Sequence, residues 1–300
     1  MLPRSLADVL WLLNSPSLLQ PGRWPDVGDP RLRQAAAGLR QAWALRGEST
    51  VAAELAAAIA DRPRLYKLGI RAEALLDWGL GQTERFRVID RQIQLHEAGR
   101  SLGELDFLIE DRHTGQLEHW ELAVKFFLWG VDGECAWIGP DRKDRLARKL
   151  ERMLVRQLPL SEGPAFAHWL AATHPPLQGR DWQRRLLSRG WLFLPPGVAF
   201  PQEQDLASDH CWRGWWLPLS QRQQAPRPTG THAWAILPRS LWLSPLRLPR
   251  DAEPELIVAP SLETAVNQAA SAPPYLTVAL DAQGQELRRG FLIRDRPERQ

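Results

Sequence analysis

The sequence predicts a mixed α+β protein whose central part runs as a helix, a three-strand antiparallel meander, a second helix and a strand. Three observations predict this order. Apolar residues recur at helical spacing from Arg64 to about Leu80, polar and apolar residues then alternate over three consecutive segments, and helical spacing returns from Asp141 to Gln157. We place this α/β-like core at 63–196, between a helical cap at 1–62 and a C-terminal region at 197–300.

The cap consists of short amphipathic stretches separated by Pro and Gly, which favour helix ends. The expected helices are Leu6 to Leu13, Pro30 to Leu45 and Val51 to Ala60.

The meander follows from three segments in which side chains alternate between polar and apolar, as strand geometry requires. Turn residues separate the segments at Ala98-Gly99-Arg100 and at His113-Thr114-Gly115. The expected strands are Arg85 to Leu95, Gly103 to Glu110 and Glu118 to Leu128.

Beyond the second core helix we expect another helix at Arg180 to Ser188 and a short buried strand at Trp191 to Leu194, closed by Pro195-Pro196. The Trp- and Pro-rich C-terminal region is a β-rich extension packed on the core. Its clearest signal is a hairpin from Tyr275 to Ile293.

Composition limits the classes of function. The net charge of +3 gives no strong basic field, so a nucleic-acid contact would need local clusters of Arg and Lys. Two distant cysteines, Cys135 and Cys211, fit a reducing compartment and argue against structural zinc. No apolar run is long enough for a signal peptide or a membrane span, so we expect a cytoplasmic protein without a membrane partner.

Two neighbouring strands of the meander place acids and a lysine on one face. In GELDFLIED, side chains alternate between the two faces of the strand, so Asp106 lies on the face opposite that of the apolar Leu105 and Phe107. In HWELAVKFFL, the same rule puts Glu121 and Lys125 together, away from the apolar side. Ordinary solvated charges would give the same pattern, but Glu121 and Lys125 lie in an otherwise strongly apolar strand, where unpaired charge is costly to bury.

Carboxylates from adjacent strands suit a hard divalent cation, which takes oxygen ligands. We therefore predict that Asp106 and Glu121 bind Mg²⁺ or Mn²⁺. The metal would activate a water molecule, and Lys125 would position that water or offset negative charge in the transition state. The expected reaction is phosphodiester hydrolysis of nucleic acid, either DNA or RNA.

At these residues the chain resembles the PD-(D/E)XK nuclease superfamily, whose core has the same element order. The resemblance implies an acid at the end of the second strand, here Asp106, and an acid with a lysine on the third, here Glu121 and Lys125. Some members add a glutamate from the first helix, which corresponds to Glu73. The phrases LGIRAEALLDWGL, GELDFLIED, HWELAVKFFLW and GPDRKDRLARKLERML are also similar to a bacterial domain family of unknown function, number 1853.

One position departs from the superfamily pattern. The acid of that pattern stands two residues before the lysine, but here Ala123 occupies that place and Glu121 lies two residues earlier. Along a strand this separates Glu121 from Lys125 by about 13 Å instead of about 7 Å. Glu73 could supply the missing carboxylate if its helix packs across the sheet.

Further candidates would contact nucleic acid. Gln92 and Gln94 on the first strand could extend the polar cleft, and the basic helix could bind phosphates; solvent-facing side chains are the alternative in both cases. The basic candidates are Arg142, Lys143, Arg145 and Lys149. The histidines near the strands, including His119, have no partner at metal-ligand spacing, so no histidine metal site is expected.

The main alternative is a catalytically inactive module with the same fold, which binds nucleic acid or a protein partner. The displaced Glu121 favours this alternative. A purely structural α+β protein is a third interpretation.

Overall fold

A single ten-stranded sheet organises the computed structural model, which describes residues 2–20, 22–26, 29–201, 206–248, 251 and 253–296. The strands follow the order β1-β2-β3-β5-β6-β10-β9-β7-β8, with β4 pairing β3. The pairs at the centre, β3-β5, β5-β6 and β6-β10, are parallel, whereas the flanking pairs are antiparallel. The predicted mixed α+β class is therefore confirmed.

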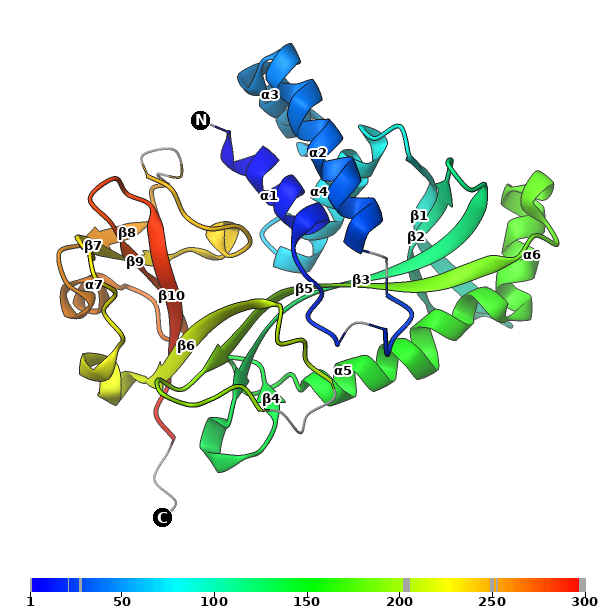
Figure 1. Ribbon diagram of the computed structural model, residues 1–300. Helices are drawn as coiled ribbons and strands as arrows, with labels where there is room; N and C mark the ends of the chain where they lie inside the picture. Colours follow the sequence, from blue (N-terminus) through cyan, green and yellow to red (C-terminus); the bar gives the residue numbers. More distant parts are fainter. Residues whose placement is uncertain are drawn as a thin grey trace.

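The helical cap lies on one face of this sheet, whereas the helix α5, Leu146–Arg152, runs along the other face (Figure 1). Apolar residues of the cap join the larger core cluster, as their spacing predicts. A buried ion pair also ties the cap to the meander, because Arg31 Nη1 lies 3.0 Å from both Asp111 Oδ2 and Glu118 Oε1. The cap helices are α1 Arg4–Asn14, α2 Asp29–Arg46 and α3 Glu48–Ile59, and α4 Leu68–Gly81 follows them.

The meander forms as predicted, with tight turns at the expected positions. Ala98 and Gly99 have φ values of 47° and 78°, the left-handed conformation of a two-residue hairpin turn. Side chains on both faces of β3 are largely buried, so Glu118 and Glu121 do not face an open solvent layer. The strands are β1 Phe86–Glu97, β2 Arg100–Asp111 and β3 Gln116–Trp129.

The predicted helix at Arg180 to Ser188 is wrong: residues 182–188 belong to strand β5, Trp182–Leu194. The strand pairs with β3 in parallel over twelve residues, from Leu117↔Trp182 to Leu128↔Phe193. Long-range pairing thus overrides the local pattern of paired leucines. The expected strand at Trp191 to Leu194 is the buried end of this longer strand.

Gly190 permits the close approach of β5 to β3. A Cβ atom at this position would lie 1.7 Å from the carbonyl oxygen of Lys125, and the glycine has a φ of 147°. No other residue type fits this contact without moving the backbone.

The basic segment forms a shorter helix than its spacing predicts. Residues 141–145 precede it as a loop in which Arg142 has a φ of 62°, and α5 begins only at Leu146. The chain continues through a π-helical turn, Met153–Gln157, and a 3₁₀ turn, Leu158–Glu162. Strand β4, Trp137–Ile138, precedes this segment, and helix α6, Pro164–Thr173, follows it.

The C-terminal region extends the sheet of the core instead of forming a second one. Its strand β6 pairs with β5, and the predicted terminal hairpin, β9 with β10, joins through β10 and β6. Residues 202–205, 249–250, 252 and 297–300 of this region lie outside the described residues. The elements are β6 Trp212–Pro218, β7 Ala233–Leu237, β8 Ile257–Ala259, α7 Leu262–Gln268, β9 Tyr275–Leu280 and β10 Glu286–Ile293.

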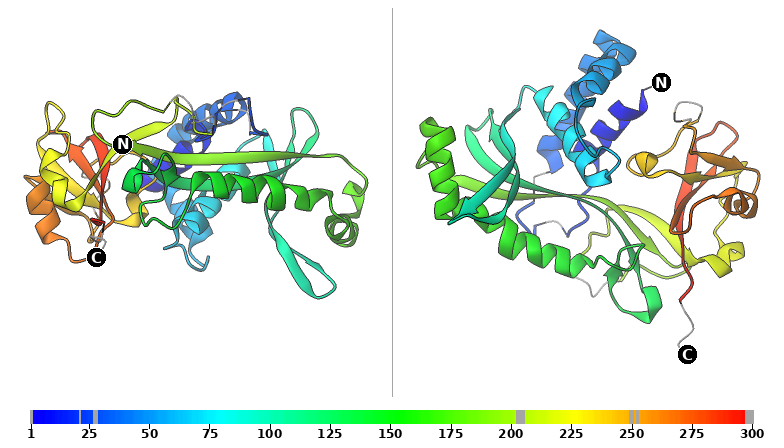
Figure 2. Two further views of the ribbon diagram at one scale, coloured as in Figure 1. Left: turned by 90° about the horizontal axis from the view of Figure 1, so that it is seen from below. Right: turned by 180° about the vertical axis from the view of Figure 1, so that it is seen from behind.

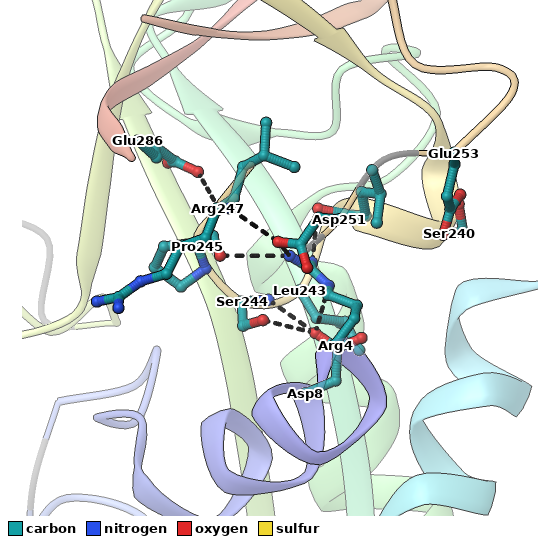
Figure 3. A network of polar contacts seen from close by, with 12 residues as sticks. Arg4, Asp8, Ser240, Leu243, Ser244, Pro245, Arg247, Asp251, Glu253 and Glu286 are labelled. Atoms are coloured by element: carbon teal, nitrogen blue, oxygen red, sulfur yellow. Dashed lines mark hydrogen bonds and ion pairs between the residues drawn. The ribbon is translucent and has the colours of Figure 1, made fainter. Parts of the chain in front are cut away.

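A buried polar network fastens helix α1 to the loop between β7 and β8 (Figure 3). Arg4 Nη2 donates to the carbonyl of Leu241 at 2.9 Å, and its Nε lies 3.1 Å from Asp8 Oδ1. The same Asp8 oxygen accepts a 2.7 Å hydrogen bond from Ser244 Oγ. The network therefore fixes the first helix and the C-terminal region relative to one another. Among the described residues, no helix has the length and apolarity to cross a bilayer.

Candidate functional site

Asp106 and Glu121 lie where strands β2 and β3 separate. The last residue pair of their antiparallel ladder is Phe107↔Trp120, and the next positions along the two strands are these two acids. Leu122 N–H donates to Asp106 Oδ2 at 2.7 Å, and the backbone N–H of Asp106 donates to the Glu121 carboxyl group. Side chains thus replace the ladder bonds at the fork. Beyond it, the β1–β2 hairpin turns away from the line of β3 and β5 (Figure 2).

Glu121 is fully buried, and both of its oxygens are hydrogen-bonded. Oε1 lies 2.9 Å from His119 Nε2, and Oε2 accepts from Gln157 Nε2 at 2.8 Å. Burial first, and then the negative charges of Glu104 and Glu73, raise the pKa of Glu121 to about 8, although Lys149 acts in the opposite direction. The sequence analysis placed this acid in an open cleft, whereas helix α5 and its continuation cover it.

The hydrogen-bond directions around His119 agree with a protonated Glu121. Burial lowers the pKa of His119 to about 3, so the ring is neutral and its contact with Glu121 is not an ion pair. Ser161 Oγ donates to the Leu158 carbonyl at 3.2 Å and therefore accepts from His119 Nδ1–H at 3.0 Å. His119 Nε2 is then an acceptor, so Glu121 Oε1 is the donor in the metal-free protein.

Asp106 is half-buried beside this group. Burial first, and then the charge of Glu121, raise the pKa of Asp106 well above its ordinary value, although the Leu122 N–H bond acts in the opposite direction. Two carboxyl groups that share such a site do not both ionise readily without a cation.

Glu73 lies on helix α4 and faces Asp106 and Glu121. A role for Glu73 at this site requires that α4 packs across the sheet in this way. Its Oε2 accepts from Gln92 Nε2 at 2.9 Å, and burial, followed by the charge of Glu104, raises its pKa. Glu73 also acts electrostatically on Asp106 and Glu121. Gln92 lies opposite Asp106 in the strand register with a φ of 52°, a strained backbone of the kind that is concentrated at functional sites. Gln94 instead donates to Glu104.

The lysine whose charge acts on the acids is Lys149 of helix α5. Its charge lowers the pKa of both Asp106 and Glu121, while burial and then the charge of Lys125 lower the pKa of Lys149 itself. Its Nζ lies 3.4 Å from Gln157 Oε1. The sequence predicts Lys149 only as a phosphate contact. Its position in the structure places it beside Asp106, Glu121 and Glu73, which we call the acidic centre.

Lys125 and the other basic candidates lie farther out. Lys125 Nζ is paired with Asp144 Oδ2, Arg142 with Asp132, and Arg145 with Glu134. Lys143 is exposed on the same loop. The structure therefore brings Glu73, Asp106, Glu121 and Lys149 together, with Lys125 at the edge of the group.

The donor set fits a hard divalent cation in its chemistry. Asp106 uses Oδ2 for the Leu122 bond, which leaves Oδ1 for a metal, and a cation would offset the buried negative charge that raises both pKa values. Within the described part of the chain, no three His, Cys, Asp or Glu side chains gather closely enough to form a ready metal-binding group. A metal would therefore also need water or backbone oxygens.

Three residues of the site were missed or misassigned, and two of them had a signal in the sequence. Lys149 stands three residues after Leu146 and four before Met153, which places it on the buried side of the helix. His119 shares a strand face with Glu121, two residues away. Gln157 gave no signal, because the π-helical turn that directs it toward Glu121 has no sequence signature.

Comparison with protein families identifies one match over nearly the whole chain, residues 7–293, to the family described as "Domain of unknown function (DUF1853)". The chain belongs to this family. Comparisons with curated proteins and with solved structures gave no match.

Proposed function

We propose that this protein of the DUF1853 family is a metal-dependent nuclease that hydrolyses phosphodiester bonds with Mg²⁺ or Mn²⁺. The observation that supports this most is the fork between β2 and β3, where Asp106 and Glu121 exchange hydrogen bonds with the partner strand while Lys149 faces both. The helix, meander, helix and strand order from α4 to β5 also supports a PD-(D/E)XK-like core.

In this proposal Asp106 and Glu121 would hold the cation together with water or backbone oxygens, with Glu73 beside them, and the cation would supply an activated water and polarise the scissile phosphate. Glu121 would bind the cation as a carboxylate, and His119 and Gln157, which contact its two oxygens, would hold it in place. Lys149 lies close enough to the acids to stabilise charge on the transferred phosphate. The Gln157 side-chain amide lies between the two residues: its Nε2 donates to Glu121 Oε2, and its Oε1 lies 3.4 Å from Lys149 Nζ. It therefore holds Glu121 and Lys149 close together.

The experiment is cleavage of single-stranded and double-stranded DNA and RNA with Mn²⁺ or Mg²⁺. We expect Asp106→Asn and Lys149→Met to lower the rate by about 10²-fold or more, because each removes a charge at the reacting phosphate. Lys67→Met, which removes an exposed lysine just before helix α4, is the matched control and should cut normally. Cleavage by Asp106→Asn at the wild-type rate would exclude the proposal.

A catalytically inactive binding module is the second candidate, and one observation favours it: both oxygens of Glu121 already have protein partners. Calorimetry with Mn²⁺ separates the two functions. The nuclease requires Mn²⁺ binding that Asp106→Asn abolishes, whereas an inactive module binds nucleic acid equally well with and without Asp106.

A further inference from the structure

A cavity of about 350 Å³ lies next to the acidic centre. Its walls come from the start of helix α4, the edge of strand β3, residues 139–144 and the C-terminal region. Leu122 and Ala123, which directly follow Glu121, line it, and so does Lys149. The cavity therefore opens beside the fork, on the side where β3 has lost its partner strand.

β5 pairs with one edge of β3, and among the described residues no strand pairs with the other edge at this cavity. β2 leaves after Trp120, and β4 joins only at Leu128. Since the Leu122 N–H points toward β2, strand alternation directs the N–H and C=O groups of Val124 and Phe126 to the same open side. The Lys125 carbonyl points the other way, toward Gly190 of β5, as this alternation requires. The cavity floor thus offers backbone donors and acceptors to a ligand.

Positive charge surrounds the cavity from three separate segments. Lys125 comes from β3, Lys149 from α5 and Arg239 from the C-terminal region. Two acids also line it: Asp144 pairs with Lys125, and Asp141 accepts from the backbone N–H of Lys143, so the cations of the lining exceed its acids by one charge.

Arg239 has no carboxylate partner among the described residues, and its guanidinium lies 5.6 Å from the ring centre of Trp242. The remaining walls are apolar, formed mainly by Leu68, Phe126, Trp242 and Pro274.

We propose that this cavity binds one unpaired nucleotide of a nucleic-acid strand, with Arg239 and Lys149 on its phosphates and its base against the apolar walls. A nucleotide combines negative charge, an apolar ring and edge groups that can pair with the free backbone of β3. The volume lies at the lower end of small-ligand sites, too small for a duplex. This deepens the proposed function: the C-terminal region selects strand ends or single strands.

Two pairs of variants test the cavity. Gly69 lines it from helix α4, and a Cβ there meets nothing within 4 Å, so Gly69→Phe adds a ring at the cavity wall from a position where the Cβ has room. Gly81, at the exposed far end of the same helix, has the same freedom, and Gly81→Phe is its control. Arg239→Gln removes the proposed phosphate contact, and Arg288→Gln removes an exposed arginine of β10 as its control.

The probe is a fluorescein-labelled hexathymidylate strand, titrated in EDTA so that binding is measured without metal or cleavage. We expect Gly69→Phe and Arg239→Gln each to weaken binding about tenfold or more, and both controls to match the wild type. A relaxed, covalently closed circular duplex, which has neither strand ends nor unpaired loops, should bind at least about tenfold more weakly than the strand. Equal binding of strand and closed duplex, unchanged binding by Gly69→Phe, or no binding of the strand would overturn the inference.

The outcome is separable from that of the proposed function. If Asp106→Asn abolishes cleavage while Gly69→Phe leaves strand binding and cleavage intact, the nuclease stands and the nucleotide cavity is refuted. If the wild type binds the strand through Gly69 and Arg239 but cuts nothing with any divalent cation, the cavity stands and the nuclease is refuted.

Discussion

Replacing Glu121 with glutamine converts a buried acid into an amide of nearly the same shape. The amide can donate from Nε2 to His119 and accept from Gln157, which are the hydrogen bonds that protonated Glu121 forms. The variant therefore keeps the packing of the site and removes only its ionisation. We expect it to fold with near wild-type stability below pH 4.5, where Glu121 is protonated in the folded and the unfolded chain alike.

The effect on stability depends on pH with a definite sign. The pKa of Glu121 rises from an ordinary 4.5 to about 8 in the folded protein, so between these values the unfolded chain releases a proton that the folded chain keeps. The free energy of unfolding then falls by up to about 1.4 kcal/mol per pH unit, and by at most about 5 kcal/mol in all. This contribution is complete below pH 4.5 and is lost as the pH rises through about 8. The Glu121→Gln variant has no ionisable group at this position, so its free energy of unfolding does not fall for this reason as the pH rises.

Urea denaturation in EDTA at pH 6, 7, 8 and 9 measures this directly. The wild type should lose stability steadily over this range, and Glu121→Gln should lose less and exceed the wild type at pH 9. Glu97→Gln, an exposed position on the β1–β2 hairpin, should follow the wild type. If the curves of Glu121→Gln and the wild type run parallel, Glu121 is ionised in the folded protein and the proton assignment is wrong.

Three further predictions concern buried contacts. Gly190→Ala should lose at least about 3 kcal/mol of stability in thermal or urea unfolding, because the methyl group would overlap the Lys125 carbonyl; a loss under about 1 kcal/mol would contradict that contact. Asp8→Ala should cost about 2–3 kcal/mol in the same assay, since Arg4 keeps Asp251 but the buried N–H and Oγ of Ser244 lose their acceptor; an unchanged midpoint would mean that the Asp8 contacts of Figure 3 contribute nothing. Cys135, which is exposed, should react with a thiol reagent at pH 8 in the folded protein, whereas Cys211, whose pKa burial raises to about 12, should react only in urea; equal rates would contradict its burial.

The elements with a strong periodic pattern were predictable from the sequence. The cap helices, the meander with its turn at Ala98-Gly99 and the terminal hairpin all form near their expected positions. Strand β5 was not predictable at its start, because its residues match a helix as well as a strand until β3 pairs with them. The start of α5 was also misplaced, since the residues before Leu146 share the basic composition of the helix.

The candidate site was predictable in part. Alternation identified Asp106 and Glu121 as neighbours on adjacent strands, and helical spacing placed Glu73 within reach. Alternation could not show that the strands separate at these acids, because a fork is a relation between two strands. The sequence pattern predicts Lys125 as the cation beside the acids, whereas the structure has Lys149 there. This position depends on how α5 crosses the sheet, which strand alternation does not show.

The sequence by itself determined which residue types face each side of a strand or helix, because side-chain direction follows from local backbone geometry. It therefore named the acids of this protein. Only the tertiary structure decided their environment: it buried Glu121 against His119 and Gln157, brought Lys149 to them, and closed a cavity with Arg239 from more than a hundred residues away. Burial and charge–charge distance set these pKa values, and both arise from packing between segments that are remote in the chain.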